Sequence, residues 1–210
     1  MQLTKLASIA LLLFAGLFSP ALAGQYQDVI SNAFPGFQIL RRSEIRLDKD
    51  NLDPEIYDRV KDHPGLVAGR FNSDKLTDFA ALIRGSRLIH IPENKADGVW
   101  AAEDYYEGYL AVCLGRAQGG YECTKLKTDP MRIRKPHLDF LTKISPGSEM
   151  CSILRRFQAP KPKRNLNVLE PREGPVEITF GTDAIGLFGS DSVIFVPQPR
   201  GMYLECGVGG

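Results

Sequence analysis

The sequence has almost no net charge, because 26 Lys and Arg residues nearly balance 25 Asp and Glu residues and leave a formal charge of +1. Such a chain has no whole-molecule attraction to nucleic acid or to an anionic membrane surface, so we expect no nucleic-acid partner. The sequence also lacks the G-x-S-x-G, H-E-x-x-H and P-loop motifs, so no enzyme class is indicated and no catalytic residue is assigned. Its histidines, too widely spaced for a two-His metal motif, are His63, His90 and His137.

No apolar run is long enough to suggest a membrane span. The run Leu6–Phe18 is shorter than the about 20 residues that a spanning helix needs. Lys5 precedes it and Ala21-Leu22-Ala23 follows it, which is the pattern of a cleaved signal peptide. The sequence therefore predicts a signal peptide over 1–23, and a single globular domain over 24–210 that is soluble and either periplasmic or secreted.

Cysteine pairs at zinc-binding spacing are absent as well. An even number of cysteines in an exported chain indicates disulfides, whereas zinc needs pairs separated by about two to four residues. Two of the four cysteines, Cys113 and Cys123, lie on the arms of an expected hairpin. They face each other in a register that also pairs Leu110 with Leu126. This register favours a Cys113–Cys123 disulfide, which leaves Cys151 to pair with Cys206.

Hydrophobic periodicity predicts an α+β, β-rich fold. We expect mainly antiparallel sheet with two or three short helices, stapled by disulfides. Asp53 as N-cap and Pro54 at the first helical position mark one helix, and Gly85-Ser86 is typical of a tight hairpin turn. The expected helices are Tyr26–Phe34 and a helix from Asp53 to about Lys61. The expected strands are Phe37–Leu40, Leu66–Ala68, Asp78–Arg84, Arg87–Pro92, Tyr109–Gly115, Tyr121–Lys127, Pro175–Phe180, Ser192–Val196 and Met202–Cys206.

The segment Gly69–Ala80 reads GRFNSDKLTDFA and resembles one FG-GAP repeat, the integrin-type or VCBS-type propeller unit whose core reads G-D-F-N-G-D-G-x-x-D-hydrophobic-A. In that family, acidic residues at the first, third, fifth and ninth loop positions bind calcium. The resemblance thus implies a degenerate calcium loop formed by Asn72, Asp74 and Asp78. Arg70 at the first position and Lys75 at the usual glycine favour instead a structural turn without a cofactor.

The FG-GAP-like unit covers only about 66–91, and the sequence has no second copy. A propeller needs several blades of roughly 40 residues each, so a full propeller is not expected. The chain is similar to exported bacterial proteins that hold one such unit inside a non-propeller domain. That similarity implies no activity.

Two segments are candidate partner surfaces. An aromatic segment either stacks on sugars or fills the core, since aromatic rings serve both roles. A basic, proline-broken segment over about 155–175 is expected to be an extended loop, which either binds an anionic partner or is a solvated charge run. The candidate residues are Trp100, Tyr105 and Tyr106 in the first segment and Arg155, Arg156, Lys161, Lys163 and Arg164 in the second.

We therefore expect a non-enzymatic binding or structural domain of the cell envelope or extracellular space, whose partner is a protein or a glycan. The alternative is an envelope hydrolase with a site assembled from distant residues. A deep pocket with convergent polar groups and titration-shifted carboxylates or His would favour the hydrolase. Shallow surfaces would favour the binding domain.

Overall fold

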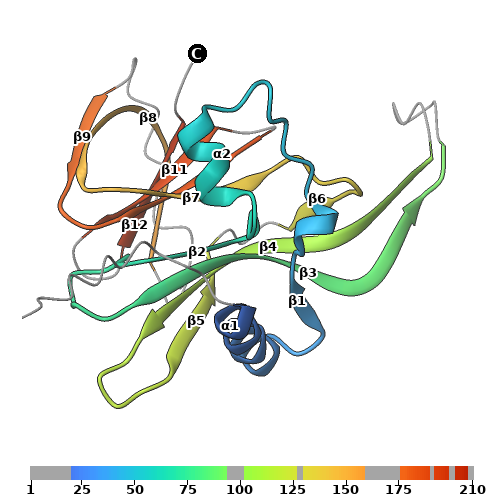
Figure 1. The fold of residues 1–210 in the computed structure, drawn as a ribbon, viewed down its shortest axis with the longest axis horizontal. Helices are drawn as coiled ribbons and strands as arrows, with labels where there is room; N and C mark the ends of the chain where they lie inside the picture. The colour runs from blue at the N-terminus through green and yellow to red at the C-terminus, as the bar shows by residue number, and fades with distance from the viewer. Residues whose placement is uncertain are drawn as a thin grey trace, which may run out of the picture.

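The described part of the chain folds into two antiparallel six-stranded sheets with two α-helices and one short 3-10 helix (Figure 1). The β-rich, antiparallel architecture expected from the sequence is confirmed. The computed structural model describes residues 20–93, 102–126, 130–158, 176–189, 192–198 and 202–207, and within these it leaves aside the side chains of 20–23, 148–158, 176 and 202. The helices are α1 Pro20–Ala33, η1 Arg42–Glu44 and α2 Pro54–Val60. The strands are β1 Phe37–Ile39, β2 Leu66–Gly69, β3 Asp78–Ile91, β4 Glu103–Gly115, β5 Tyr121–Lys125, β6 Met131–Ile133, β7 Phe140–Ile144, β8 Gly147–Gln158, β9 Val176–Phe180, β10 Ala184–Phe188, β11 Val193–Gln198 and β12 Met202–Gly207.

The first sheet is built on the two long strands β3 and β4. Strands β2 and β1 pair with successive parts of the outer edge of β3. Strands β5 and β6 divide the outer edge of β4 in the same way. The run Phe79–Ile83 in β3 is buried on both faces, because the second sheet packs on one face and α1 on the other.

The second sheet has the strand order β7-β10-β11-β12-β8-β9. Its inner face shares one apolar core with the first sheet, in which Leu82 and Leu110 meet Leu141, Ile185 and Phe195. The sequence analysis missed β6, β7, β8 and β10. Prolines and charges around β6 and β7 are typical of loops, and tertiary packing overrides that local preference.

Helix α1 covers the outer face of the first sheet (Figure 1). Tyr26 stacks on Phe79 with ring centroids 4.2 Å apart, and Ile30 is fully buried. The helix begins at Pro20 rather than at Tyr26, since proline is well suited to a first helical turn. Helix α2 begins as predicted, because the Asp53 carboxylate accepts hydrogen bonds from the N–H groups of the first helical turn.

The prediction of a hairpin at Gly85-Ser86 is wrong. Strand β3 runs without a break from Asp78 to Ile91, and the register against β4 shifts between Arg84 and Leu88. Over that stretch β3 advances four residues while β4 advances two, from Gly108 to Tyr106, so β3 carries a bulge. A glycine inside a strand marks a bulge as readily as a turn, which is why the sequence pattern was misread.

The predicted Cys113–Cys123 disulfide is confirmed. The two residues are paired directly across β4 and β5, and their sulfur atoms are bonded. Gly119 and Gly120 both have positive φ and close the connecting turn. The second predicted disulfide involves Cys151, whose side chain lies outside the described residues, so Cys151–Cys206 remains a prediction.

The extended loop predicted over about 155–175 is wrong at its start. Arg155 and Arg156 belong to strand β8, where they pair with Glu205 and Leu204 of β12. The arginines precede the prolines of this segment, so nothing prevents them from donating to a sheet. Lys161, Lys163 and Arg164 lie outside the described residues, as does Trp100.

Candidate functional site

The carboxylate of Asp78, the last ligand position of the FG-GAP-like loop, is fully buried. Its Oδ2 accepts a hydrogen bond from the Phe71 N–H at 2.7 Å, and its Oδ1 accepts one from the Gly115 N–H at 2.9 Å. Burial raises the pKa of Asp78 to about 6 and outweighs these hydrogen bonds, which lower it. Asp78 therefore fixes the loop against the end of β4.

The other two candidate ligands hold the turn itself. The Asp74 carboxylate accepts hydrogen bonds from the Leu76 N–H and from the Asn72 side-chain amide, and the Asn72 side chain accepts one from the Asp74 N–H. These are the local bonds by which Asx residues stabilise turns. Within the described residues, no three His, Cys, Asp or Glu side chains are grouped as metal ligands. The oxygens of Asn72 and Asp74 are thus engaged within the turn, and Arg70 occupies the first position of the calcium pattern.

The same loop joins the two sheets. The Arg70 N–H donates to the Asp183 carboxylate at 2.9 Å, and the Tyr203 hydroxyl, from β12, donates to the Phe71 carbonyl at 2.8 Å. Phe71 is almost fully buried. The loop thus has a structural role in this chain.

The predicted aromatic surface does not form one platform. Tyr105 and Tyr106 are consecutive residues of β4 and lie on opposite faces. The Arg132 guanidinium lies over the Tyr105 ring at 5.3 Å, and the Arg84 guanidinium lies over the Tyr106 ring at 4.3 Å. The protein's own cations therefore occupy positions over both rings.

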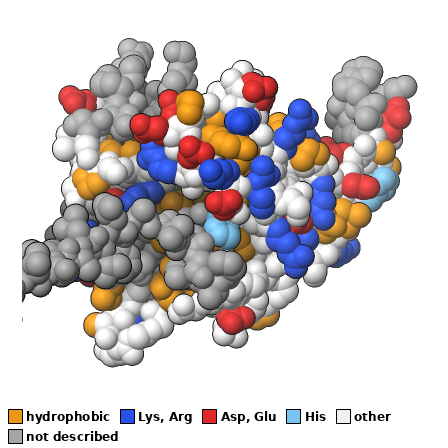
Figure 2. Space-filling model, in the orientation of Figure 1, with side chains coloured by type: hydrophobic (Ala, Val, Ile, Leu, Met, Phe, Trp, Pro, Cys, Tyr) orange, Lys and Arg blue, Asp and Glu red, His pale blue; other side chains and the backbone are white. Residues whose placement is uncertain are grey.

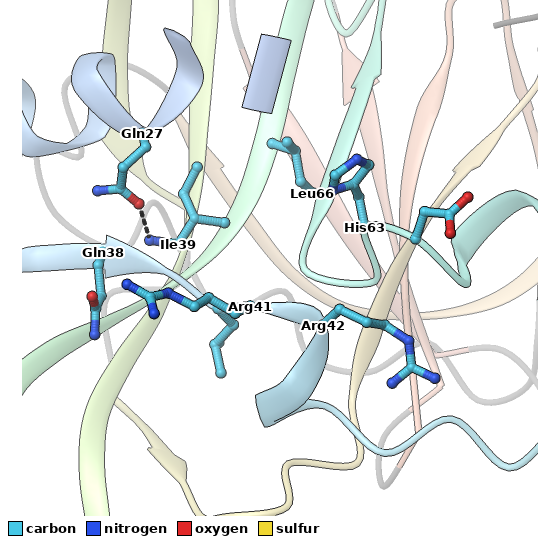
Figure 3. Close-up of a pocket in the computed structure, with 9 residues that line it drawn as sticks. Gln27, Gln38, Ile39, Arg41, Arg42, His63 and Leu66 are labelled. Atoms are coloured by element: carbon cyan, nitrogen blue, oxygen red, sulfur yellow. Dashed lines mark hydrogen bonds between the residues drawn. The ribbon is translucent and has the colours of Figure 1, made fainter. Parts of the chain in front are cut away.

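The structure shows a concave region that the sequence analysis missed, at the corner where β1 meets η1 (Figure 3). This first hollow has a volume of about 450 Å³. Aliphatic side chains of Leu40 and Leu66 contribute to it, and both are buried. Its lining residues are Gln27, Gln38, Ile39, Leu40, Arg41, Arg42, Asp62, His63 and Leu66.

A second hollow of about 510 Å³ lies between α2 and strands β2 and β7. Asp62, His63 and Leu66 line both hollows, so the two adjoin; together we call them the His63 groove. The residues that line only the second hollow are Asp58, Arg59, Val60, Val67, Ala68, Leu141, Thr142 and Lys143.

Arg41 and Arg42 give the first hollow its charge. Figure 3 shows Arg41 turned toward Gln27 and Gln38, and Arg42 turned the opposite way, toward the side on which His63 lies. Both side chains are exposed, and within the described part of the chain neither forms an ion pair with a carboxylate. Figure 2 shows further Lys and Arg side chains gathered over η1 and β6 on the same face.

A buried ion pair holds this arginine-bearing segment in place. Oε1 of Glu44 lies 2.7 Å from Nη2 of Arg84 and 3.3 Å from Nζ of Lys135. The other oxygen of Glu44 accepts a hydrogen bond from the Arg41 N–H at 3.0 Å. Burial acts to raise the pKa of Glu44, but these bonds together hold it below its ordinary value. Glu44 is therefore ionised and fixes the backbone that carries Arg41 and Arg42.

The buried pair His137 and Asp139 has the side-chain types of an acid–base site, but it lies outside the groove. His137 Nε2 is 3.3 Å from Asp139 Oδ2, and both side chains are more than nine-tenths buried. Burial lowers the pKa of His137, with Asp139 acting against that change. None of the described groups with a shifted pKa lines the His63 groove.

Comparison of the chain with protein-family models, with curated proteins and with solved structures found no match in any of the three. Among the described residues, none of the helices has the length and apolar character needed to cross a membrane.

Proposed function

We propose that this chain is exported and acts as a non-enzymatic binding domain of the cell envelope or extracellular space, with the His63 groove as its binding site. The observation that carries the proposal is the first hollow, where two exposed arginines that form no ion pair within the described part of the chain border buried aliphatic side chains. A pocket that combines apolar surface with a few placed polar groups is typical of binding sites. The partner is an envelope or extracellular protein or glycan.

The buried titratable groups of the kind that active sites use lie outside the groove, which favours binding over hydrolysis. Active sites concentrate groups whose pKa values are displaced by burial or by neighbouring charge. Here Asp78 and His137 have displaced pKa values, yet Asp78 is engaged with backbone N–H groups and neither residue lines the His63 groove. No observation favours the alternative of an envelope hydrolase.

Export is supported by the position of the first core residue. Tyr26 is the first described residue that is buried, and it follows the expected cleavage point at Gly24 by two positions. Removal of 1–23 therefore keeps Tyr26 and Ile30, the buried residues of α1 that the structure describes. N-terminal sequencing of the protein recovered from cells that express the full chain should begin at Gly24, and material that still begins at Met1 would contradict export.

We also propose that the FG-GAP-like unit is a structural loop in a domain that is not a propeller. Its support is the set of backbone bonds accepted by Asp74 and Asp78 and the bonds of Arg70 and Phe71 to the second sheet. These contacts give the loop a role that needs no bound ion.

The binding proposal is tested by capture of components from the envelope fraction of the cells that make the protein. The protein purified after expression of the full chain and its Arg41→Ala/Arg42→Ala variant are immobilised in parallel. A component retained by the natural protein and released by the variant is the expected result. Identical retention by both proteins would contradict the groove as the binding site. Chemical breakdown of the retained component during incubation would favour the hydrolase.

A further inference from the structure

We infer that the His63 groove binds an acidic peptide segment with aliphatic side chains, rather than a glycan or a nucleic acid. This inference rests on the proposed binding function and specifies the ligand class at that same site. It depends on three features of the groove: the kind of apolar surface, the position of unneutralised charge and the blocked edge of β1.

The apolar part of the groove is aliphatic throughout. Val60, Leu66, Val67 and Leu141 are buried lining residues, and among the described residues that line the two hollows there is no Phe, Tyr or Trp, the imidazole of His63 being their one aromatic ring. Sugars and unpaired bases are bound chiefly by stacking on flat aromatic faces. Aliphatic pockets accept the side chains of Leu, Ile or Val. The lining therefore favours a peptide.

The charge of the groove is uneven along its length. In the second hollow the cations are neutralised, because Arg59 pairs with Glu55 at 3.5 Å and Lys143 lies 3.9 Å from Asp183. In the first hollow Arg41 and Arg42 form no ion pair among the described residues, and they outnumber Asp62, the one carboxylate in its lining. Arg42 donates one hydrogen bond to the Ile45 carbonyl at 2.8 Å, and the two side chains point to opposite sides. Two separated guanidinium groups match carboxylates placed at intervals along a chain better than one compact anion.

The outer edge of β1 is closed to strand addition. The Ile39 N–H donates to Oε1 of Gln27 at 2.8 Å, and the Phe37 N–H donates to the Phe34 carbonyl at 3.0 Å. A ligand therefore cannot gain affinity by pairing its backbone with this strand. Recognition through side chains remains, with carboxylates at Arg41 and Arg42 and aliphatic groups on the surface formed by Leu40 and Leu66.

The test is a fluorescence-anisotropy titration of the full-length product with the labelled peptide Glu-Leu-Glu-Leu-Glu-Leu-Glu-Leu. Comparison probes are Lys-Leu-Lys-Leu-Lys-Leu-Lys-Leu, an all-Glu peptide of the same length, an oligonucleotide of thymidines and a hyaluronate oligosaccharide. We expect the Glu-Leu peptide to bind most tightly, and its binding to weaken as salt is raised from about 0.05 to about 0.3 M, because exposed charges are screened.

Two variants that remove exposed arginine charge locate the site, a double variant in the groove and a single control variant outside it. Arg41→Ala/Arg42→Ala should weaken binding of the Glu-Leu peptide by roughly tenfold or more. Arg87→Ala, which removes an exposed charge from the far part of β3, should leave it unchanged.

Equal binding of the all-Glu or Lys-Leu peptide would overturn the inference, as would equal loss in Arg87→Ala. Preferential, arginine-dependent binding of hyaluronate or of the oligonucleotide would overturn the ligand class and leave the groove as the binding site. No arginine-dependent binding by any probe or by the envelope fraction would overturn both proposals.

Discussion

At the scale of single residues, Asp78 connects the FG-GAP-like loop to the pH dependence of stability. Burial raises the pKa of Asp78 in the folded protein to about 6, above the ordinary value of 3.8 for an aspartate side chain. The folded state therefore binds a proton more readily than the unfolded state between these pH values, and its stability decreases as pH rises through that range.

This difference predicts a specific loss in Asp78→Asn. Between pH 7 and pH 5, Asp78 should contribute a gain of roughly 1 kcal/mol to the free energy of unfolding of the natural protein. The variant should lack that gain, and it should also be less stable at pH 7 because an amide cannot accept both backbone hydrogen bonds. Urea unfolding at the two pH values measures both effects. An identical pH dependence in the two proteins would contradict this role for Asp78.

Glu44 is the second residue with a predicted energetic role. Its Glu44→Gln variant leaves the buried guanidinium of Arg84 without its counter-charge, and one side of a buried pair typically costs about 3–5 kcal/mol to remove. We expect a clear fall in the urea midpoint. The double variant Glu44→Leu/Arg84→Met should recover part of that loss, because it removes both charges together. A double variant that loses the sum of the two single effects would contradict the pairing.

At the scale of secondary-structure elements, the FG-GAP-like loop predicts no response to calcium. Ion binding at about a hundredfold excess over the dissociation constant would stabilise the fold by ~2.7 kcal/mol, which corresponds to several degrees in the melting midpoint. We expect the same midpoint in millimolar calcium and in chelator, since the carboxylates of Asp74 and Asp78 are used by backbone N–H groups. A rise in calcium that Asp78→Asn abolishes would restore the metal-site interpretation.

The β4–β5 hairpin predicts a moderate effect of its disulfide. Cys113 and Cys123 are ten residues apart, so by the chain-entropy model the bond contributes about 2–3 kcal/mol. The variant Cys113→Ser/Cys123→Ser should lose about that amount in urea unfolding while retaining its β-sheet circular dichroism. Loss of the sheet signal at all urea concentrations would show that the disulfide is required for folding. Non-reducing peptide mapping would test Cys151–Cys206 in the same protein.

The elements that the sequence predicted well are those with local signals. Asp53-Pro54 predicts the start of α2. The alternation of side chains along the two arms of the β4–β5 hairpin predicts that Cys113 and Cys123 face each other. The bulge at Gly85 could not be distinguished from a turn, because what decides between them is pairing with β4, which lies far along the chain. Strand β10 was missed for a similar reason, since its Gly186 interrupts the apolar run and only packing shows that it continues.

At the scale of the whole molecule, the composition and the alternation of apolar residues predicted a β-rich antiparallel fold, and the two sheets confirm it. They did not predict the His63 groove, because it is formed by segments that meet only in the folded chain: β1 and η1, the loop after α2, and β7. Arg41-Arg42 is a visible dipeptide in the sequence, yet its position beside Leu66 depends on the pairing of β1 and β2 with β3.

Binding of an acidic peptide at the His63 groove is tested most directly by an amide chemical-shift titration. The isotope-labelled protein, purified after expression of the full chain, is titrated with the alternating Glu-Leu peptide. If the His63 groove is the binding site, the amides of Gln38, Arg41, Arg42 and His63 should shift together along one binding curve, and those of Arg87 and His90 should not move. In Arg41→Ala/Arg42→Ala the binding curve should move to peptide concentrations higher by roughly tenfold or more. Shifts confined to the part of β3 that follows Arg84 would contradict binding at the groove. The same holds if no amide shifts at any peptide concentration and the envelope fraction also leaves these amides unperturbed.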